Sequence, residues 1–446
     1  MISRRDSQKT HTRESHTSSS DIGETGDRRV SSLRTIEATA LYLKVVLKNL
    51  IVLIMKNFCL TGLLLAMLAG IVAGRIEFDL YREEPTLETI SRSKRSLHEH
   101  KAAWKNESVV LYKFMNGEYY GTIGVGSPSK PFKVIFDTTW ADSWLPSSHC
   151  GWTEIACSRY QLHNQYDSSK SSSYFPNGEF INLTSSELSL VGILSTDTFH
   201  LAHVKVVNQT FLEATHMSLN PFLQYKADGI VGLAYQEQSG WKGVTPFFYN
   251  MIRQNLVQEH VFTFYMNRDE TTPKAGKVIL GGRQRSHMKE DTLTVLNVVE
   301  KKFWMIQMDS MFAEKNKTNY PICEKCRAIF DSSSNTIVGP PNDILKLNYM
   351  LNAVYVPGIN RYTVNCRNYA KLPKIHFILK GNDFVIQSKY YVQRLTLENI
   401  EACFSPFVPN ANATEQTWEL GGAFMMEFYT EFDFDNNVVN IAETIF

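Results

Sequence analysis

The stretch Ile135-Phe136-Asp137-Thr138-Thr139 recurs later in the chain as Ile329-Phe330-Asp331-Ser332-Ser333. Each copy is followed, at a similar interval, by an apolar-apolar-Gly signature, which is Ile230-Val231-Gly232 in the first half and the looser Glu419-Leu420-Gly421 in the second. Similarity at so long a period indicates two related structural units. Because each unit places one aspartate after an apolar strand, the repeat predicts two β lobes around a pseudo-twofold axis. One carboxylate from each lobe would then meet at a central cleft.

The sequence around both copies is typical of a mostly β protein. Apolar and polar residues alternate in short runs separated by turn residues, for example at 133–136, 204–207 and 262–265. Helical periodicity is clearest at 245–254 and 341–351. We therefore expect many short strands and few helices.

Length and charge limit the classes of function. The 446 residues, 43% of them hydrophobic, suit two or three domains of about 150 residues. Lys and Arg number 46 against 45 Asp and Glu, and no basic block occurs. Nucleic-acid binding depends mainly on neutralising phosphates, so we expect no nucleic-acid partner.

The N-terminal region predicts entry into the secretory pathway. Lys56 precedes an apolar run at 60–72 that ends in the small residues Ala73 and Gly74, a pattern typical of a signal peptide. We take 55–74 as that signal and 1–54 as a disordered or untranslated extension. A membrane anchor is the alternative, because apolar residues recur at 41–54, but lysines keep both segments below about 20 uninterrupted residues.

The glycosylation and cysteine patterns also agree with entry into the secretory pathway. We expect the protein either outside the cell or in the lysosome. Apart from Cys59 in the signal, six cysteines lie in local pairs, although other connectivities are possible. The Cys-X-X-Cys at 323–326 lacks a second ligand pair, so we expect no metal site and no cofactor. Five Asn-X-Ser/Thr acceptors occur, at Asn106, Asn182, Asn208, Asn316 and Asn412.

The paired aspartates suggest a specific chemistry. Two carboxylates held about 3 Å apart cannot both ionise, so they share one proton. The ionised carboxylate takes a proton from a bound water, and the protonated one donates to a peptide carbonyl. For either aspartate alone, capping of a turn would be the simpler interpretation. The repeated context favours a catalytic pair, Asp137 and Asp331.

From about Tyr112 to its end, the chain resembles the pepsin-like aspartic peptidases of the cathepsin D type, the standard example of such proton sharing. The motifs that carry the resemblance are spread over both halves: Tyr119-Tyr120-Gly121-Thr122-Ile123-Gly124-Val125-Gly126, Trp144-Leu145-Pro146-Ser147, Lys170-Ser171-Ser172-Ser173-Tyr174, Ala227-Asp228-Gly229-Ile230-Val231-Gly232, Ile337-Val338-Gly339-Pro340 and Phe432-Asp433-Phe434-Asp435-Asn436-Asn437.

The resemblance implies a bilobal fold with a peptide or protein bound in the central cleft of a monomer. It divides the chain into a basic propeptide at 75–106, an N-terminal lobe at 107–294 and a C-terminal lobe at 295–446. It also implies the disulfides Cys150–Cys157, Cys323–Cys326 and Cys366–Cys403, which are the three local pairs.

Both active-site loops depart from the family pattern, which is Asp-Thr-Gly followed by Ser or Thr. Thr139 and Ser333 replace the glycines, and they bring side chains into the space beside the reacting water. Trp140 replaces a small hydroxyl residue that would bond the first aspartate. Thr138 retains the inter-lobe hydroxyl, and Ser332 and Ser334 are conservative changes.

The lid over the cleft departs as well. Ser185 falls at the position of the family's flap tyrosine, which covers the substrate and excludes water. Asn182 could add a glycan near the base of this flap.

The changes in the loops and the flap together predict a catalytically impaired homologue that binds peptides or protein partners. The alternative is an active acid endopeptidase, because both aspartates are retained. A membrane would be involved only if the 41–54 segment is an uncleaved anchor.

Overall fold

The computed structural model describes residues 75–82, 119–158, 163–184, 189–222, 226–266, 274–357, 360–397, 400–410 and 416–445. The predictions for 1–74, for most of the propeptide, and for Ser185, Asn106 and Asn412 lie outside these residues. Within the described ranges, no helix is both long enough and apolar enough to cross a membrane.

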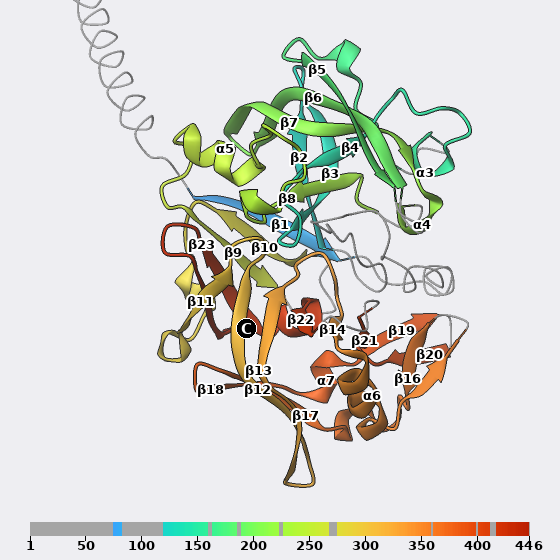
Figure 1. Ribbon diagram of the computed structural model, residues 1–446, viewed down its shortest axis with the longest axis vertical. Coiled ribbons are helices and arrows are strands. Elements are labelled where there is room, and N and C mark those ends of the chain that lie inside the picture. The colour runs from blue at the N-terminus through green and yellow to red at the C-terminus, as the bar shows by residue number, and fades with distance from the viewer. Residues whose placement is uncertain are drawn as a thin grey trace, which may run out of the picture. The chain divides into compact units, whose positions relative to one another are not determined.

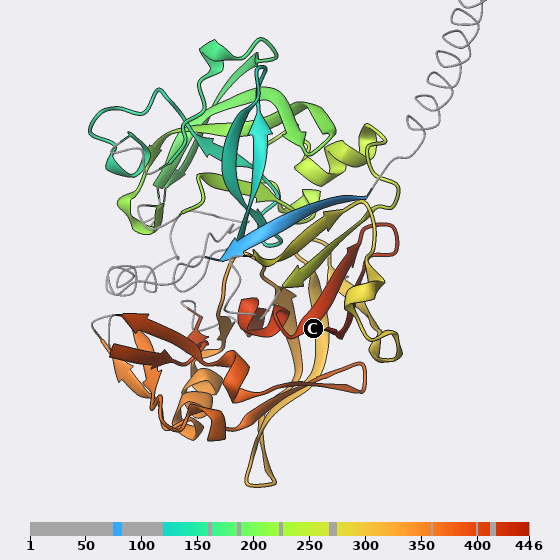
Figure 2. The ribbon, with the colours of Figure 1, turned by 180° about the vertical axis from the view of Figure 1, so that it is seen from behind.

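An antiparallel sheet joins the two halves of the chain (Figures 1 and 2). Strands from the first half pair with strands from the second where β9 (Val261–Met266) lies next to β23 (Phe428–Asp433). Phe264 of β9 is paired there with Thr430 of β23. This sheet confirms the predicted bilobal, mostly β architecture. Its strand order is β1 (Ile76–Arg82), β10 (Lys274–Leu280), β9 (Val261–Met266), β23 (Phe428–Asp433), β24 (Val438–Glu443) and β11 (Thr294–Glu300).

The first lobe is built from strands whose apolar residues point inward. The alternating segments expected at 133–136, 204–207 and 262–265 all lie in strands, and the helix expected at 245–254 is α5 (Phe247–Arg253). The strands of this lobe are β2 (Tyr119–Val125), β3 (Lys130–Asp137), β4 (Trp144–Pro146), β5 (Phe175–Thr184), β6 (Ser189–Leu201), β7 (Val204–Met217) and β8 (Gly229–Gly232), with short helices α3 (Ile155–Ser158) and α4 (Leu219–Phe222).

The second lobe repeats this plan and adds a small separate sheet. Its main strands are β12 (Met305–Lys315), β13 (Thr318–Phe330), β14 (Ile337–Gly339), β17 (Lys374–Leu379), β18 (Asn382–Ile386), β21 (Phe407–Pro409) and β22 (Thr417–Leu420). The small sheet has the order β15 (Val354–Val356), β16 (Arg361–Val364), β20 (Ile400–Phe404) and β19 (Gln393–Leu397). The helices are α6 (Pro341–Met350), as expected, α7 (Ser388–Tyr391) and α8 (Gly422–Met425).

The two lobes share a local topology that explains the internal sequence repeat. In the first lobe β8 pairs in parallel with β3 and antiparallel with β4, and in the second β22 pairs in the same way with β13 and β14. A Cβ atom added at Gly232 or Gly421 would collide with backbone carbonyl oxygens of the adjoining loop. Both repeated glycines are therefore required by the close approach of the backbone.

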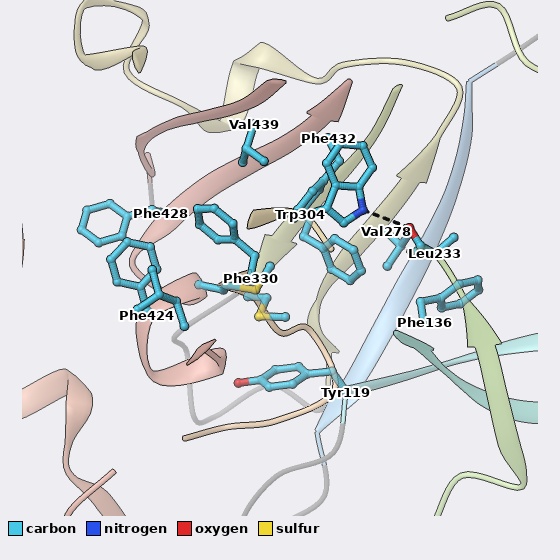
Figure 3. Close-up of a cluster of buried hydrophobic side chains, with 14 of the residues drawn as sticks. Tyr119, Phe136, Leu233, Val278, Trp304, Phe330, Phe424, Phe428, Phe432 and Val439 are labelled. Carbon is cyan, nitrogen blue, oxygen red and sulfur yellow. Dashed lines mark hydrogen bonds between the residues drawn. The ribbon is translucent and has the colours of Figure 1, made fainter. Parts of the chain in front are cut away.

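Aromatic side chains fill the core where the lobes meet (Figure 3). Trp304 and Phe432 lie with ring centroids 5.1 Å apart, and Phe432 also packs against Phe330. The indole Nε1 of Trp304 donates a hydrogen bond to the carbonyl oxygen of Leu233, at 3.0 Å. This bond links the second lobe to the chain just after β8.

The three predicted disulfides are present: Cys150–Cys157, Cys323–Cys326 and Cys366–Cys403. The cysteines of the Cys-X-X-Cys motif are thus bonded to each other. In the described part of the chain, one group of potential metal ligands lies close together, Cys366, Glu401 and Cys403, and its two sulfurs form a disulfide.

Strand β1, at the start of the predicted propeptide, contributes buried apolar side chains to the central sheet. Leu80 is fully buried, and its strand pairs with both β10 and β2. We expect Leu80→Ala to lower the free energy of unfolding by about 2–4 kcal/mol, because the truncation leaves a cavity. Chemical denaturation measures this change. Trp152→Ala is the control, because Trp152 is 89% exposed. Equal stability of the two variants would contradict the contribution of β1.

Candidate active site

The two aspartates occupy equivalent places at the junction of the lobes. Asp137 ends β3, and Asp331 directly follows β13. Both are almost completely buried, with 3% and 2% of their surface exposed. Carboxylates are rarely buried to this degree without specific partners, so the site is built to hold them.

A reciprocal set of hydrogen bonds fixes the two loops against each other. The Thr138 hydroxyl donates to the carbonyl oxygen of Phe330 at 2.7 Å, and the Ser332 hydroxyl donates to that of Phe136 at 2.6 Å. Each hydroxyl oxygen also accepts the backbone N–H of the other residue, at 3.0 Å. The inter-lobe role expected for Thr138 is present here, and Ser332 provides its symmetric counterpart.

Each aspartate is held by the residue two positions later in the chain. Oδ1 of Asp137 accepts bonds from the backbone N–H and the side-chain hydroxyl of Thr139, both at 2.7 Å. Oδ1 of Asp331 accepts the same pair from Ser333, at 3.0 and 2.7 Å. The residues that replace the family's glycines therefore turn their hydroxyls onto the carboxylates.

The residues one position further along do not bond the aspartates in this way. The Trp140 side chain packs in the core of the first lobe with Ile135 and Trp144. The Ser334 hydroxyl bonds within its own loop, to the backbone N–H and the hydroxyl of Thr336. Trp140 has no hydroxyl to donate, and Thr139, whose hydroxyl was not expected to bond the aspartate, donates to Asp137 instead.

The Ser333 hydroxyl donates to Asp331 and also affects the pKa of Asp137. Burial raises the pKa of Asp137, while hydrogen bonds from Thr139 and then from the Ser333 side chain lower it. Because a hydroxyl carries one proton, Ser333 can donate to only one carboxylate at a time. The Ser333 hydroxyl, which donates to Asp331, therefore also influences the aspartate of the other lobe.

A third carboxylate, which the site prediction missed, acts on Asp137. The negative charge of Glu419 contributes to raising the pKa of Asp137. A signal for it was present in the sequence. The repeat Ile230-Val231-Gly232 corresponds to Glu419-Leu420-Gly421, so a charged residue stands where the first lobe has isoleucine.

Three of the predicted glycan acceptors lie on the surface. Asn182, Asn208 and Asn316 are exposed, as glycan acceptors must be, and their modification stays a prediction. The flap residue Ser185 lies in the gap between β5 and β6, outside the described residues.

A β protein of two similar lobes, with one buried aspartate from each at their junction, has the architecture of an aspartic peptidase. The chain matches the family described as eukaryotic aspartyl protease over residues 118–444, and it belongs to that family. It is 35% identical over 342 residues to cathepsin D of Gallus gallus, covering 75% of this chain and 83% of that protein. Cathepsin D of Homo sapiens is 34% identical over 351 residues, with 75% and 82% covered, and renin of Rattus norvegicus is 35% identical over 337, with 75% and 81% covered.

Asp142 ties the first active-site loop to a neighbouring turn. Its carboxylate accepts bonds from the Ser239 hydroxyl at 2.6 Å and the Gly240 N–H at 3.2 Å. Burial outweighs these two donors and raises the pKa of Asp142 to about 6. The folded protein therefore holds this proton more tightly than the unfolded chain does.

This raised pKa predicts that stability depends on pH. Between about pH 4, where an unfolded aspartate ionises, and the folded pKa of about 6, the folded state binds more protons, so stability falls as pH rises. We expect Asp142 to contribute a loss of about 2–3 kcal/mol across this window. In urea unfolding at a series of pH values, Asp142→Asn should flatten the slope, and Asp435→Asn, at an exposed carboxylate, should not. An unchanged slope in Asp142→Asn would contradict the assignment.

Proposed function

We propose that this protein is a secretory-pathway homologue of the pepsin and cathepsin D endopeptidases that binds peptides at the lobe junction and hydrolyses them slowly or not at all. The observation that carries this proposal is the Ser333 hydroxyl. It donates to Asp331 at 2.7 Å, and its hydrogen bond also lowers the pKa of Asp137.

The hydroxyl is placed to compete with the reacting water. Hydrolysis requires a water held by both carboxylates, so that one accepts its proton while the other protonates the peptide carbonyl. A serine hydroxyl that donates to Asp331 leaves that carboxylate with fewer acceptor positions to orient the water. Loss of well-placed acid–base geometry costs about 10²–10⁴-fold in rate. Thr139 takes up part of the hydrogen-bonding capacity of Asp137 in the same way.

An active acid endopeptidase is the second candidate function. It is favoured by the reciprocal bonds of Thr138 and Ser332, which hold the two aspartates in equivalent buried positions. The rise in the pKa of Asp137 also suits a carboxyl group that keeps a proton in mildly acidic solution.

The ligand and the compartment follow from the family and the sequence. Pepsin-like proteases bind peptide substrates in a cleft, and we assign the same class of ligand to this chain. The predicted signal peptide and the exposed acceptors Asn182, Asn208 and Asn316 support a location in the extracellular space or the lysosome, where we propose that the protein acts as a monomer. No nucleic-acid partner is proposed.

Hydrolysis of denatured globin in acidic solution tests the proposal. The unmodified protein should release few peptides, and the joint variant Thr139→Gly, Trp140→Ser, Ser185→Tyr and Ser333→Gly should release many more. Ser333→Gly alone should recover only part of this, because residues that act as a unit are not additive. Ser334→Ala is the matched control, because its hydroxyl bonds Thr336 rather than an aspartate.

Any recovered hydrolysis must be blocked by a transition-state-mimicking aspartic-protease inhibitor and must be lost on Asp137→Asn. If the unmodified protein already cleaves globin efficiently, and Asp137→Asn abolishes that cleavage, the second candidate function is correct.

A further inference from the structure

A β-bulge presents Asn208 on the surface of the first lobe. Asp197 of β6 pairs with Gln209 of β7. Two positions further along β6, Phe199 pairs with Val206, which lies three positions back along β7. Strand β7 therefore has one extra residue here. Asn208 lies in this bulge with a φ of 52°, a left-handed conformation that asparagine adopts more readily than most residues, and it is exposed.

Helix α5 packs against β7 (Figure 1), and two side chains at its C-terminal end bond the bulge. Gln254 accepts the backbone N–H of Val207 at 3.0 Å and donates to its carbonyl oxygen at 2.8 Å. Asn250 donates to the carbonyl oxygens of Val207 and Asn208, at 3.2 and 3.4 Å. These bonds fix the backbone of the bulge, and none of them uses the Asn208 side chain.

A polar cavity, here called the bulge cavity, lies between the bulge and α5. Its volume is about 360 Å³, at the lower end of the range of about 300–1,000 Å³ that ligand pockets have. Its lining includes Asn208 itself, Val207, Thr245, Arg253 and Gln254. Val207 is 44% exposed and offers an apolar surface, while the others offer hydrogen-bonding groups. Such a lining suits a sugar, whose ring has polar edges and apolar C–H faces.

Arg253 supplies the charged group of the bulge cavity. One guanidinium nitrogen, Nη1, donates to the Thr245 hydroxyl at 2.8 Å. A guanidinium group has five N–H donors, so this bond leaves donors for a further acceptor. A carbonyl or hydroxyl oxygen in the cavity would receive a charge-assisted hydrogen bond from Arg253.

We propose that Asn208 carries an N-linked glycan whose first N-acetylglucosamine residue is bound in the bulge cavity, against Val207 and hydrogen-bonded to Arg253 and Thr245. The acceptor itself lines the cavity, so the covalent link holds the sugar there at a high effective concentration. The sugar would join the bulge of β7 to α5. The inference goes beyond the proposed function and shares with it only entry into the secretory pathway, where such glycans are added.

Asn316 provides a matched control within the same chain. It also has a φ of 52°, is exposed and begins an acceptor sequence. It lies in the turn between β12 and β13 and is not part of the lining of the bulge cavity. A glycan on Asn316 should therefore extend into solvent.

The test is the rate at which a peptide N-glycosidase removes each glycan from the native protein, expressed as the full chain in animal cells. The enzyme cuts the bond between asparagine and the first sugar and leaves aspartate, so mass spectrometry of peptides measures each acceptor separately. A bound first sugar must leave the cavity before the enzyme can reach this bond. We expect release at Asn208 to be about tenfold slower than at Asn316, as one or two net hydrogen bonds would make it. The difference should disappear after denaturation.

Two variants and one control complete the experiment. Arg253→Ala and Thr245→Val remove polar groups of the bulge cavity, and each should bring release at Asn208 to within about twofold of release at Asn316. Arg367→Ala, at an exposed arginine of the second lobe, should keep the tenfold difference. Arg253 is exposed, so its truncation leaves the core intact and decides the test if Thr245→Val impairs folding.

The outcomes separate this inference from the proposed function. The inference is overturned if Asn208 carries no glycan while Asn182 or Asn316 does, if the native release rates are equal, or if slow release persists in both cavity variants. The proposed function stands in each of these cases. If none of the acceptors carries a glycan, the secretory location in the proposed function fails and the inference fails with it.

Discussion

Two hydroxyl groups that cross between the lobes are the constraint on which the rest of the site depends. Thr138 and Ser332 each donate to a carbonyl oxygen of the strand that carries the other lobe's aspartate, and each accepts the other's backbone N–H. All of these groups are buried. If the strand ends separated, each group left without a hydrogen bond would reduce the stability of the fold by about 1–3 kcal/mol. The positions of Asp137 and Asp331 are therefore maintained while neighbouring residues vary.

Within that frame, the departures in the two loops follow one rule. At the third position of each loop a side chain replaces glycine, and its hydroxyl turns onto the aspartate that precedes it by two residues. At the fourth position Trp140 packs into the first lobe, and Ser334 bonds Thr336. Each loop thus supplies a hydroxyl donor to its own carboxylate from the third position. Glu419 adds a further negative charge to the same site.

The architecture could be predicted because its signals are local. An aspartate after an apolar strand and a glycine at a close backbone crossing appear as short motifs, and their repetition predicts two lobes. The effect of the Ser333 hydroxyl on the pKa of Asp137 could not be predicted, because it depends on how the two lobes meet. The orientation of Glu419 likewise depends on the register between β22 and β13, which are far apart in the sequence. The strand β1 lies in the expected propeptide, for which the motifs predict no strand, although Ile76, Phe78 and Leu80 alternate with charged residues as they would in a strand.

The central claim is that the Ser333 hydroxyl bonds Asp331 in competition with the reacting water. A crystal structure from acidic solution, at a resolution that shows ordered water, tests it directly. The account predicts that Ser333 Oγ lies within hydrogen-bonding distance of Asp331, with no water between the carboxyl groups of Asp137 and Asp331. An ordered water bonded to both aspartates, with the Ser333 hydroxyl turned away from them, would contradict it.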